Sequence, residues 1–303
     1  MEKKFQMAVH RSGFVNIVGK PNVGKSTLMN VLVGERLSII TSKAQTTRHR
    51  IMGIVNGSLD GGDDFQIVYS DTPGMLKPQY ELHQSMMRFV STALEDADVI
   101  LFVTDLFDKR EDEDTALEKL ANTDVPVILV LNKIDLAKGT QMQDKMDYWK
   151  EIIQPTEAIP VSALEKVNVG EVFQAILRYV PEHPPYFPKD EVTDKPERFF
   201  AAEIVREKIF LNYKQEVPYS SEVVVTEFKE DDKIIRMRCE IYVERQSQKG
   251  ILIGKGGESL KKVGIQAREE LEKFFGKQVH LEQFVKVAPN WRREQRRLRN
   301  FGY

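Results

Sequence analysis

The chain has 303 residues, of which 41% are hydrophobic and 30% are charged, and its formal net charge at pH 7 is -2. This composition is typical of a globular protein of about two domains and excludes a chain that is basic throughout. The single cysteine, Cys239, excludes an intrachain disulfide and gives no zinc motif. We find no secretory signal at the start and no run of about 18 apolar residues, so we expect a cytoplasmic protein.

Short apolar segments alternate with longer amphipathic segments up to about residue 180. Strands are predicted over residues 14–18, 66–70, 99–104 and 127–131, and helices over 25–33, 84–96, 112–122 and 169–179. This alternation predicts an α/β domain over residues 1–180, with a mainly parallel sheet covered on both faces. Five prolines then fall within residues 181–196, which we interpret as a semi-rigid linker.

The order of elements changes after the linker. Residues 200–213 are expected to be helical, and residues 222–229 and 234–243 alternate like the strands of a hairpin. Helices follow over 247–253 and 259–275, then a strand over 278–286 and a short arginine-rich segment over 291–303. These elements predict a second, α+β domain over residues 197–303.

The strongest motif is Gly19-Lys-Pro-Asn-Val-Gly24-Lys25-Ser26, which matches the P-loop pattern and lies between an apolar strand and a helix. Its backbone N–H groups are expected to surround phosphates, with Lys25 at the β- and γ-phosphates and Ser26 on Mg²⁺. An ATPase or a small-molecule kinase carries the same loop. The residues that we expect to contact the nucleotide here are Gly19, Asn22, Val23, Gly24, Lys25, Ser26 and Thr27.

The segment Asn132-Lys133-Ile134-Asp135 directly follows an apolar strand and favours guanine over adenine. A carboxylate at Asp135 can accept hydrogen bonds from both the ring N–H and the exocyclic amine of guanine, a donor pair that adenine lacks. Lys133 can lay its stem along the base. We expect three further residues to complete the base site, with the N–H of Ala163 at the guanine O6: Ser162, Ala163 and Leu164.

Two more segments fall in the order expected of a GTP site. In Asp71-Thr-Pro-Gly74, Asp71 is expected to hold Mg²⁺ through water, and the N–H of Gly74 to contact the γ-phosphate. A threonine hydroxyl within residues 42–50, which include Thr46 and Thr47, would complete the coordination of Mg²⁺ only when a γ-phosphate is bound. Such a contact would couple the nucleotide state to the order of this loop.

The second domain carries the motif Gly254-Lys255-Gly256-Gly257 between two predicted helices. A GXXG turn of this kind lets a nucleic-acid backbone approach closely, although a plain helix–helix turn has the same letters. In the arginine-rich end, basic residues alternate with aromatic ones, which favours contact with RNA; a solvated closing helix and a peripheral membrane contact are the alternatives. The predicted RNA-binding residues are Gly254, Lys255, Gly256, Gly257, Lys261, Lys262, Trp291, Arg292 and Arg293.

Together these motifs resemble the translation-factor-related GTPases, and Gln45-Thr-Thr-Arg-His-Arg50 closely resembles the Era family. The resemblance covers nearly the full chain. It implies a bacterial GTPase with a C-terminal type II KH domain, which binds the 3′ end of 16S rRNA and assists assembly of the 30S subunit. We further expect a monomer, with peripheral contact to the inner membrane as the alternative use of the basic end. By the same resemblance, Thr47 would be the switch threonine. The expected catalytic residues are then Lys25, Thr47 and Gly74, and the expected ligands of Mg²⁺ are Ser26, Thr47 and Asp71.

Met75 departs from the Ras-like pattern, in which a glutamine at this position orients the attacking water. Methionine cannot orient water by hydrogen bonding, so we expect slow intrinsic turnover. Related GTPases with a hydrophobic residue at this position often use a monovalent cation, and the resemblance makes Asn22 the candidate ligand of K⁺.

Three classes of function therefore remain open on the sequence. The first is a GTP-switched RNA-binding assembly factor, and the second is a P-loop ATPase or kinase. The third is a GTPase whose second domain binds protein or lipid. Base preference separates the second class from the first, and salt-dependent RNA binding separates the third.

Overall fold

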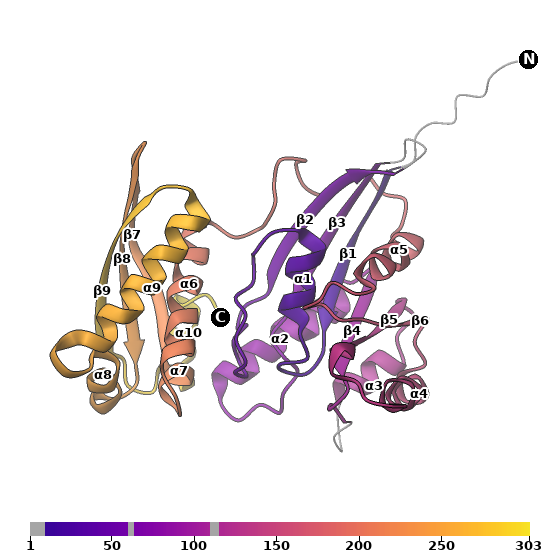
Figure 1. Cartoon of the computed structure of the whole chain (residues 1–303), viewed down its shortest axis with the longest axis horizontal. Coiled ribbons are helices and arrows are strands. Elements are labelled where there is room, and N and C mark those ends of the chain that lie inside the picture. Colours follow the sequence, from indigo (N-terminus) through magenta and orange to yellow (C-terminus); the bar gives the residue numbers. More distant parts are fainter. Residues whose placement is uncertain (1–9, 60–63, 110–114) are drawn as a thin grey trace, which may run out of the picture. The chain divides into compact units, whose positions relative to one another are not determined.

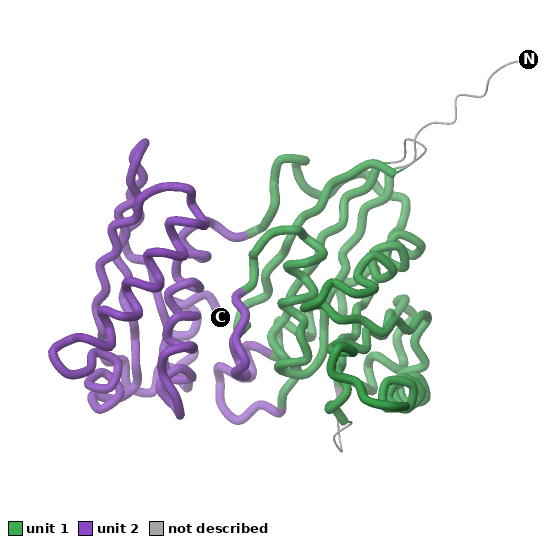
Figure 2. The backbone as a smooth tube through the Cα atoms, viewed as in Figure 1, with its two compact units in different colours: residues 1–38, 47–76, 87–194 green, residues 39–46, 77–86, 195–303 purple. Residues whose placement is uncertain are grey.

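The structure is a computed structural model that describes residues 10–59, 64–109 and 115–303 (Figure 1). It divides into two compact units, which Figure 2 distinguishes by colour. The first comprises residues 1–38, 47–76 and 87–194, and the second comprises residues 39–46, 77–86 and 195–303. No helix within the described ranges is long and apolar enough to cross a membrane.

A six-stranded sheet in the order β2-β3-β1-β4-β5-β6 forms the centre of the first unit. All neighbouring strands are parallel except β2 and β3, which confirms the expected mainly parallel sheet. The antiparallel edge strand β2 was not predicted. The strands are β1 (His10–Val18), β2 (Ile51–Ser58), β3 (Asp64–Asp71), β4 (Val99–Asp105), β5 (Val127–Asn132) and β6 (Glu157–Pro160).

Helices cover both faces of this sheet (Figure 1). The helices α1 and α5 pack together on one face, whereas apolar side chains of α2, α3 and α4 share a core with β4 and β5 on the other. In that core the rings of Phe102 and Trp149 meet edge to face with centroids 5.3 Å apart. The helices are α1 (Lys25–Val33), α2 (Glu81–Glu95), α3 (Thr115–Ala121), α4 (Gln141–Ile153) and α5 (Val169–Tyr179).

Some of these helices differ from the expectation. The helix α4 was not predicted, and the expected start of α3 at residue 112 lies outside the described residues. Every residue of β4 and of β5 is buried, as expected of central strands in a parallel sheet. Parallel strands end at the same edge of a sheet, so the loops that follow β1, β3, β4 and β5 are brought together there.

Residues 181–194, which we expected to form a linker, instead lie along the first unit. The N–H of Ser12 donates to Pro181 O at 3.1 Å, and the N–H of Ile54 donates to Val192 O at 2.9 Å. The buried amide oxygen of Gln66 accepts from the N–H of Phe187 at 2.9 Å. This proline-rich segment therefore packs along the sheet, and several of its backbone groups are hydrogen-bonded to the first unit.

A three-stranded sheet in the order β7-β8-β9 forms the second unit with helices packed on it (Figure 1). Strands β7 and β8 are antiparallel, and β8 and β9 are parallel. The predicted order of helix, strand, strand, helix, helix and strand is confirmed, with short helices added. The elements are α6 (Glu197–Asn212), α7 (Val217–Ser220), β7 (Glu222–Glu230), β8 (Ile234–Val243), α8 (Gln246–Ile253), α9 (Glu258–Phe275), β9 (Gln278–Val287) and α10 (Gln295–Asn300).

Candidate functional site

The P-loop forms the turn between β1 and α1, and the protein itself leaves no room for side chains at two of its glycines. Gly19 has a φ of 150° and Gly24 a φ of 98°. A Cβ atom on Gly19 would lie 2.1 Å from Val103 O, and a Cβ atom on Gly24 would lie 2.1 Å from Asn132 Nδ2. The turn leads directly into the N-terminus of α1, where helical N–H groups favour an anion.

Lys25 occupies the first position of α1 and is buried. Its Nζ donates to Gly19 O at 3.0 Å and to Lys20 O at 2.8 Å, both within the same loop. Burial lowers the pKa of Lys25 to about 8, while the carboxylates of Asp71 and Asp108 act in the opposite direction. The polyanionic phosphates of a nucleotide would act in the same direction as these carboxylates and keep the ammonium charged.

Three oxygen-bearing side chains converge beside this lysine. Ser26 Oγ donates to Asp71 Oδ2 at 2.6 Å and lies 2.9 Å from Thr47 Oγ1. Asp71 is fully buried, its Oδ1 has no hydrogen-bond partner among the described residues, and burial raises its pKa. A cluster of a carboxylate and two hydroxyls fits Mg²⁺, which prefers oxygen ligands and would relieve the cost of burying the charge of Asp71.

The base-recognition segment is joined to the P-loop by Asn132 at the end of β5. The Nδ2 of Asn132 donates to Val23 O at 2.8 Å, and its Oδ1 accepts from the N–H of Ala163 at 2.9 Å. Ser162 Oγ donates to Asp135 Oδ1 at 2.6 Å. The structure thus places Ser162 beside Asp135 and Ala163 beside Asn132, with the N–H of Ala163 donating to the Asn132 side chain. The contact of this N–H with the guanine O6 stays a prediction.

Met75 follows Gly74 at the position where Ras-like GTPases carry glutamine. Its side chain is buried in the core that includes Val18, Val90 and Phe102. Its N–H donates to Gly19 O at 3.0 Å, so the backbone at this position is tied to the P-loop. A thioether that packs in a hydrophobic core does not orient a water molecule.

In the second unit, the loop of residues 254–257 joins α8 to α9, and its glycines differ in their surroundings. A Cβ atom on Gly254 would lie 2.2 Å from Ser259 Oγ, whereas Cβ atoms on Gly256 and Gly257 would meet nothing within 4 Å. The φ values of Gly256 and Gly257 are 61° and 82°. These two glycines therefore present bare backbone outward, beside the exposed side chain of Lys255.

A hollow of about 430 Å³ runs from this loop between α9 and β9. Cationic side chains and apolar side chains line it together, as a site for the backbone and bases of a single strand requires. The Nε2 of Gln283 is buried and has no hydrogen-bond partner among the described residues. The lining residues are Gly257, Leu260, Lys261, Gly264, Ile265, Arg268, Leu281 and Gln283.

Comparisons with known proteins assign both units. A model of the 50S ribosome-binding GTPase family matches residues 14–133, and a KH domain model matches residues 216–292. The chain is 43% identical over 300 residues to GTPase Era of Staphylococcus haemolyticus, covering 98% of both chains. It is 47% identical over 294 residues to GTPase Era of Geotalea daltonii, covering 96% of this chain and 97% of that one. The chain belongs to the Era family of GTPases.

Solved structures of Era agree with this assignment. A crystal structure of Era in complex with MgGDPNP and nucleotides 1506–1542 of 16S ribosomal RNA has a TM-score of 0.90 to this chain. It is 42% identical, and the match covers 97% of this chain and 99% of that one. As an Era-family member, the chain is a GTPase with a C-terminal KH domain, which confirms the fold and the enzyme class that the motifs predict.

The basic end of this Era-family chain is arranged differently from our expectation. Trp291 is fully buried and donates from Nε1 to Ser220 O at 2.9 Å, and its ring packs against Phe301. The guanidinium of Arg292 pairs with the carboxylate of Glu244. The prediction that Trp291 offers its ring to RNA bases is therefore wrong for this conformation, because the ring closes the end of the KH unit. Arg293, in contrast, is exposed.

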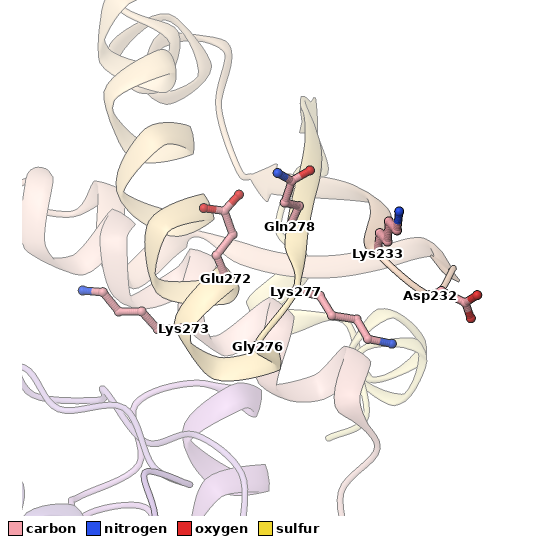
Figure 3. A pocket seen from close by; sticks show the side chains of 7 residues that line it. All are labelled: Asp232, Lys233, Glu272, Lys273, Gly276, Lys277 and Gln278. Atoms are coloured by element: carbon pink, nitrogen blue, oxygen red, sulfur yellow. The ribbon is translucent and has the colours of Figure 1, made fainter.

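The KH unit has a second hollow, of about 630 Å³, at the opposite end of α9 from the GXXG loop (Figure 3). Three lysines border it, but their side chains diverge in Figure 3 instead of converging on one point. One of them, Lys277, donates to Glu230 Oε1 at 2.6 Å. Asp232 and Glu272 share this rim, so carboxylates offset part of the charge of the three lysines.

The sequence did not single out the β9 side of the hollow between α9 and β9. Leu281 and Gln283 alternate with exposed residues along β9, a pattern that predicts one buried face and nothing more specific. Gly264 was also missed, although a Cβ atom there would lie 3.0 Å from Gln283 Oε1. A glycine within an amphipathic helix was the one available signal that another group approaches closely at this point.

Proposed function

We propose that this GTPase binds the single-stranded 3′ end of 16S rRNA through its KH unit and assists assembly of the 30S ribosomal subunit. The observation that carries the proposal is the continuous surface from the bare backbone of Gly256 and Gly257 into the hollow that Lys261 and Arg268 line. The related Era crystallised with nucleotides 1506–1542 of 16S ribosomal RNA supports the choice of this RNA. Phosphates of the strand would lie at the loop and the helix cations, and bases would enter the hollow.

An oligonucleotide comparison tests this proposal. We expect the full-length protein to bind RNA of the 16S 3′-end sequence at least about tenfold more tightly than a scrambled strand of the same composition. The comparison is made in GTP-analogue and GDP states and over a salt series, so that phosphate attraction is separated from base reading. Equal binding of both strands at every salt concentration would contradict the proposal and leave a protein or lipid partner for the KH unit.

In the GTPase unit, we propose roles for three of the predicted residues. Lys25 would neutralise charge on the β- and γ-phosphates, and the N–H of Gly74 would hold the γ-phosphate as water attacks it. Asp135 would accept both donors of guanine. Hydrolysis breaks the bond between the γ-phosphorus and the bridging oxygen, and leaves GDP and inorganic phosphate.

The proposal includes two metal ions at this site. Ser26, Thr47 and Asp71 would hold Mg²⁺, which when bound neutralises charge on the β- and γ-phosphate oxygens. Thr47 lies in the loop after α1, so its contact would report the presence of the γ-phosphate. Asn22, at φ 65° within the P-loop, would hold K⁺ beside the phosphates. The positive charge of this ion would assist hydrolysis at a site where Met75 cannot orient the attacking water.

The arrangement of the basic end favours RNA over a membrane as its partner. Trp291 and Leu298 are buried and Phe301 packs on Tyr242, so these apolar side chains face the protein, whereas Arg293, Arg296 and Arg299 are exposed. Such a segment has little apolar surface to insert into lipid. We propose a cytoplasmic monomer; sedimentation of the protein with anionic vesicles at physiological salt would instead support contact with the inner membrane.

A further inference from the structure

The loop that follows β4 is closely hydrogen-bonded to the nucleotide site, although no motif marks it. Asp105, the last residue of β4, leads into it and is 6% exposed. Its Oδ2 accepts from Lys133 Nζ at 2.7 Å, and its Oδ1 accepts from the N–H groups of Phe107 and Asp108, both at 2.9 Å. One carboxylate therefore holds both its own turn and the lysine of the base-recognition segment.

A second carboxylate in the same loop reaches the P-loop. Asp108 forms an ion pair with Lys20 at 3.2 Å, and the side chain of each is largely buried. Thr104 Oγ1 donates to Asp108 Oδ2 at 3.0 Å, and Lys20 Nζ also donates to Lys109 O. Lys20 directly follows Gly19, the first residue of the P-loop motif.

We propose that Asp105 and Asp108 are positioning residues for the nucleotide, because they brace the base-recognition lysine and the P-loop against one loop. The inference rests on the proposed role of Lys133 at the base. The side chain of Asn132 already joins the P-loop to the segment of Ala163, through hydrogen bonds to their backbone groups. The ion pairs Asp105–Lys133 and Asp108–Lys20 add a further connection, which fixes the side chains of the two lysines.

The physical reason is preorganisation. A lysine side chain has many rotamers. The backbone of Lys133 has a φ of 63°, outside the conformations that most residues prefer. An ammonium anchored at Asp105 holds the methylene stem extended, so that the stem does not have to be ordered when a guanine base arrives. Lys20 anchored at Asp108 limits in the same way the freedom of the chain beside Gly19.

Each carboxylate can be neutralised without removing the oxygen that accepts hydrogen bonds within its own loop. Replacing Asp105 by asparagine keeps an oxygen for the N–H groups of Phe107 and Asp108 but removes the charge that holds Lys133. The fold of the turn is therefore retained while the lysine is released. Asp108→Asn does the same for Lys20, because its amide oxygen can still accept from Thr104.

Dissociation of a fluorescent GDP from the full-length protein tests the Asp105 arm. We expect Asp105→Asn and Lys133→Met each to speed dissociation by about tenfold, and the double variant to dissociate no faster than Lys133→Met alone. The exposed Asp147, on α4, provides a matched control with the same change of charge. Asp147→Asn should leave dissociation unchanged, and melting temperatures should confirm that all variants are folded.

A purely structural role of Asp105 would give a different pattern. The melting temperature would fall, and the effects of Asp105→Asn and Lys133→Met on dissociation would add, which would overturn the inference. So would unchanged dissociation of Asp105→Asn beside fast dissociation of Lys133→Met. If Lys133→Met itself left dissociation unchanged, the proposed role of Lys133 would fail first, and the brace on it would fail as a consequence.

The Asp108 arm is tested in the same way with Asp108→Asn, Lys20→Met and their combination. We expect about fivefold faster GDP dissociation in each single variant and no further gain in the double variant. Independent, additive effects or wild-type dissociation in Asp108→Asn would overturn this arm. The two arms are separable, because each cycle uses its own cation.

Discussion

The P-loop and the GXXG loop both place glycines in a turn before a helix, but for different reasons. At Gly19 and Gly24, a side chain would collide with Val103 O and Asn132 Nδ2, which belong to the protein. At Gly256 and Gly257, a side chain would meet nothing within 4 Å. The first turn is shaped by the protein around a ligand of fixed size, whereas the second is left open to a flexible polymer.

Charge is used differently in the two sites as well. Lys25 and Asp71 are buried, and burial lowers the pKa of Lys25 and raises the pKa of Asp71, so that it favours the neutral form of each. Lys255 and Lys261 are exposed on the KH unit. Charges that are desolvated in advance act strongly on a ligand, whereas exposed charges act weakly and are screened by salt. Single substitutions should therefore have large effects in the GTPase unit and graded effects in the KH unit.

The largest effect is expected for Lys25→Ala. This change removes the buried ammonium at the phosphates, and we expect the rate of GTP hydrolysis to fall by about a thousandfold. Phosphate release at saturating GTP measures it, with circular dichroism to verify the fold. Lys150→Ala, at an exposed position of α4, is the control. Wild-type turnover in a folded Lys25→Ala variant would remove this lysine from the mechanism.

The next effect concerns the choice of base. Asp135→Asn replaces two acceptors by one acceptor and one donor, so we expect affinity for GTP to fall by about a hundredfold and affinity for XTP to rise. Xanthine carries a carbonyl where guanine carries its amine. Competition of GTP and XTP for the site measures the change, with exposed Asp144→Asn as the matched control. An unchanged preference for GTP would contradict the role of Asp135.

A smaller effect is expected at the open loop. Replacing Lys255 and Gly256 together by aspartate brings two carboxylates to the phosphates, and we expect RNA affinity to fall by about thirtyfold while GTP hydrolysis is retained. Lys273→Asp, at the other end of α9, changes charge on the same helix and should leave RNA binding close to wild type. Loss of affinity in both variants alike would indicate general electrostatics instead of a loop site.

The sequence could predict the residues of short motifs, but it could not predict contacts that only the fold brings together. Residues that chemistry fixes at short spacing, such as Lys25 after Gly24, could be assigned from the motif alone. The partners Asp105 and Asp108 could not, because an aspartate at the end of a strand has many uses and only the fold brings it to Lys133 or Lys20. For the same reason Trp291 was misassigned, since an aromatic residue among arginines fits both a stacking surface and a buried plug.

The dependence on K⁺ probes whether the P-loop holds a second cation. If Asn22 holds K⁺, GTP hydrolysis in K⁺ should be roughly tenfold faster than in Na⁺, because the bound K⁺ would stabilise the negative charge that develops on the phosphates. Asn22→Ala should remove the difference between the two salts while both rates approach the Na⁺ rate. Equal wild-type rates in both salts would leave Asn22 as a residue that only shapes the turn at φ 65°.

The smallest effect is expected at the arginine-rich end, and its structure dictates which residues to change. Truncation of this end would remove Trp291, whose buried ring closes the KH unit, so it would confound RNA binding with stability. Arg293, Arg296 and Arg299 are exposed and can be replaced by glutamine without disturbing that core. We expect RNA affinity of the triple variant to fall by only about fivefold, since each exposed phosphate contact contributes little.

The salt dependence of this triple variant decides its interpretation. Each lost phosphate contact should reduce the slope of log affinity against log salt by about 0.7 for a single strand. Arg292→Gln is the matched contrast, because Arg292 is paired with Glu244 and should contribute less to the slope while lowering the melting temperature more. If the triple variant kept the wild-type slope, the exposed arginines would not contact RNA, and the whole interface would lie within the loop and the hollow beside α9.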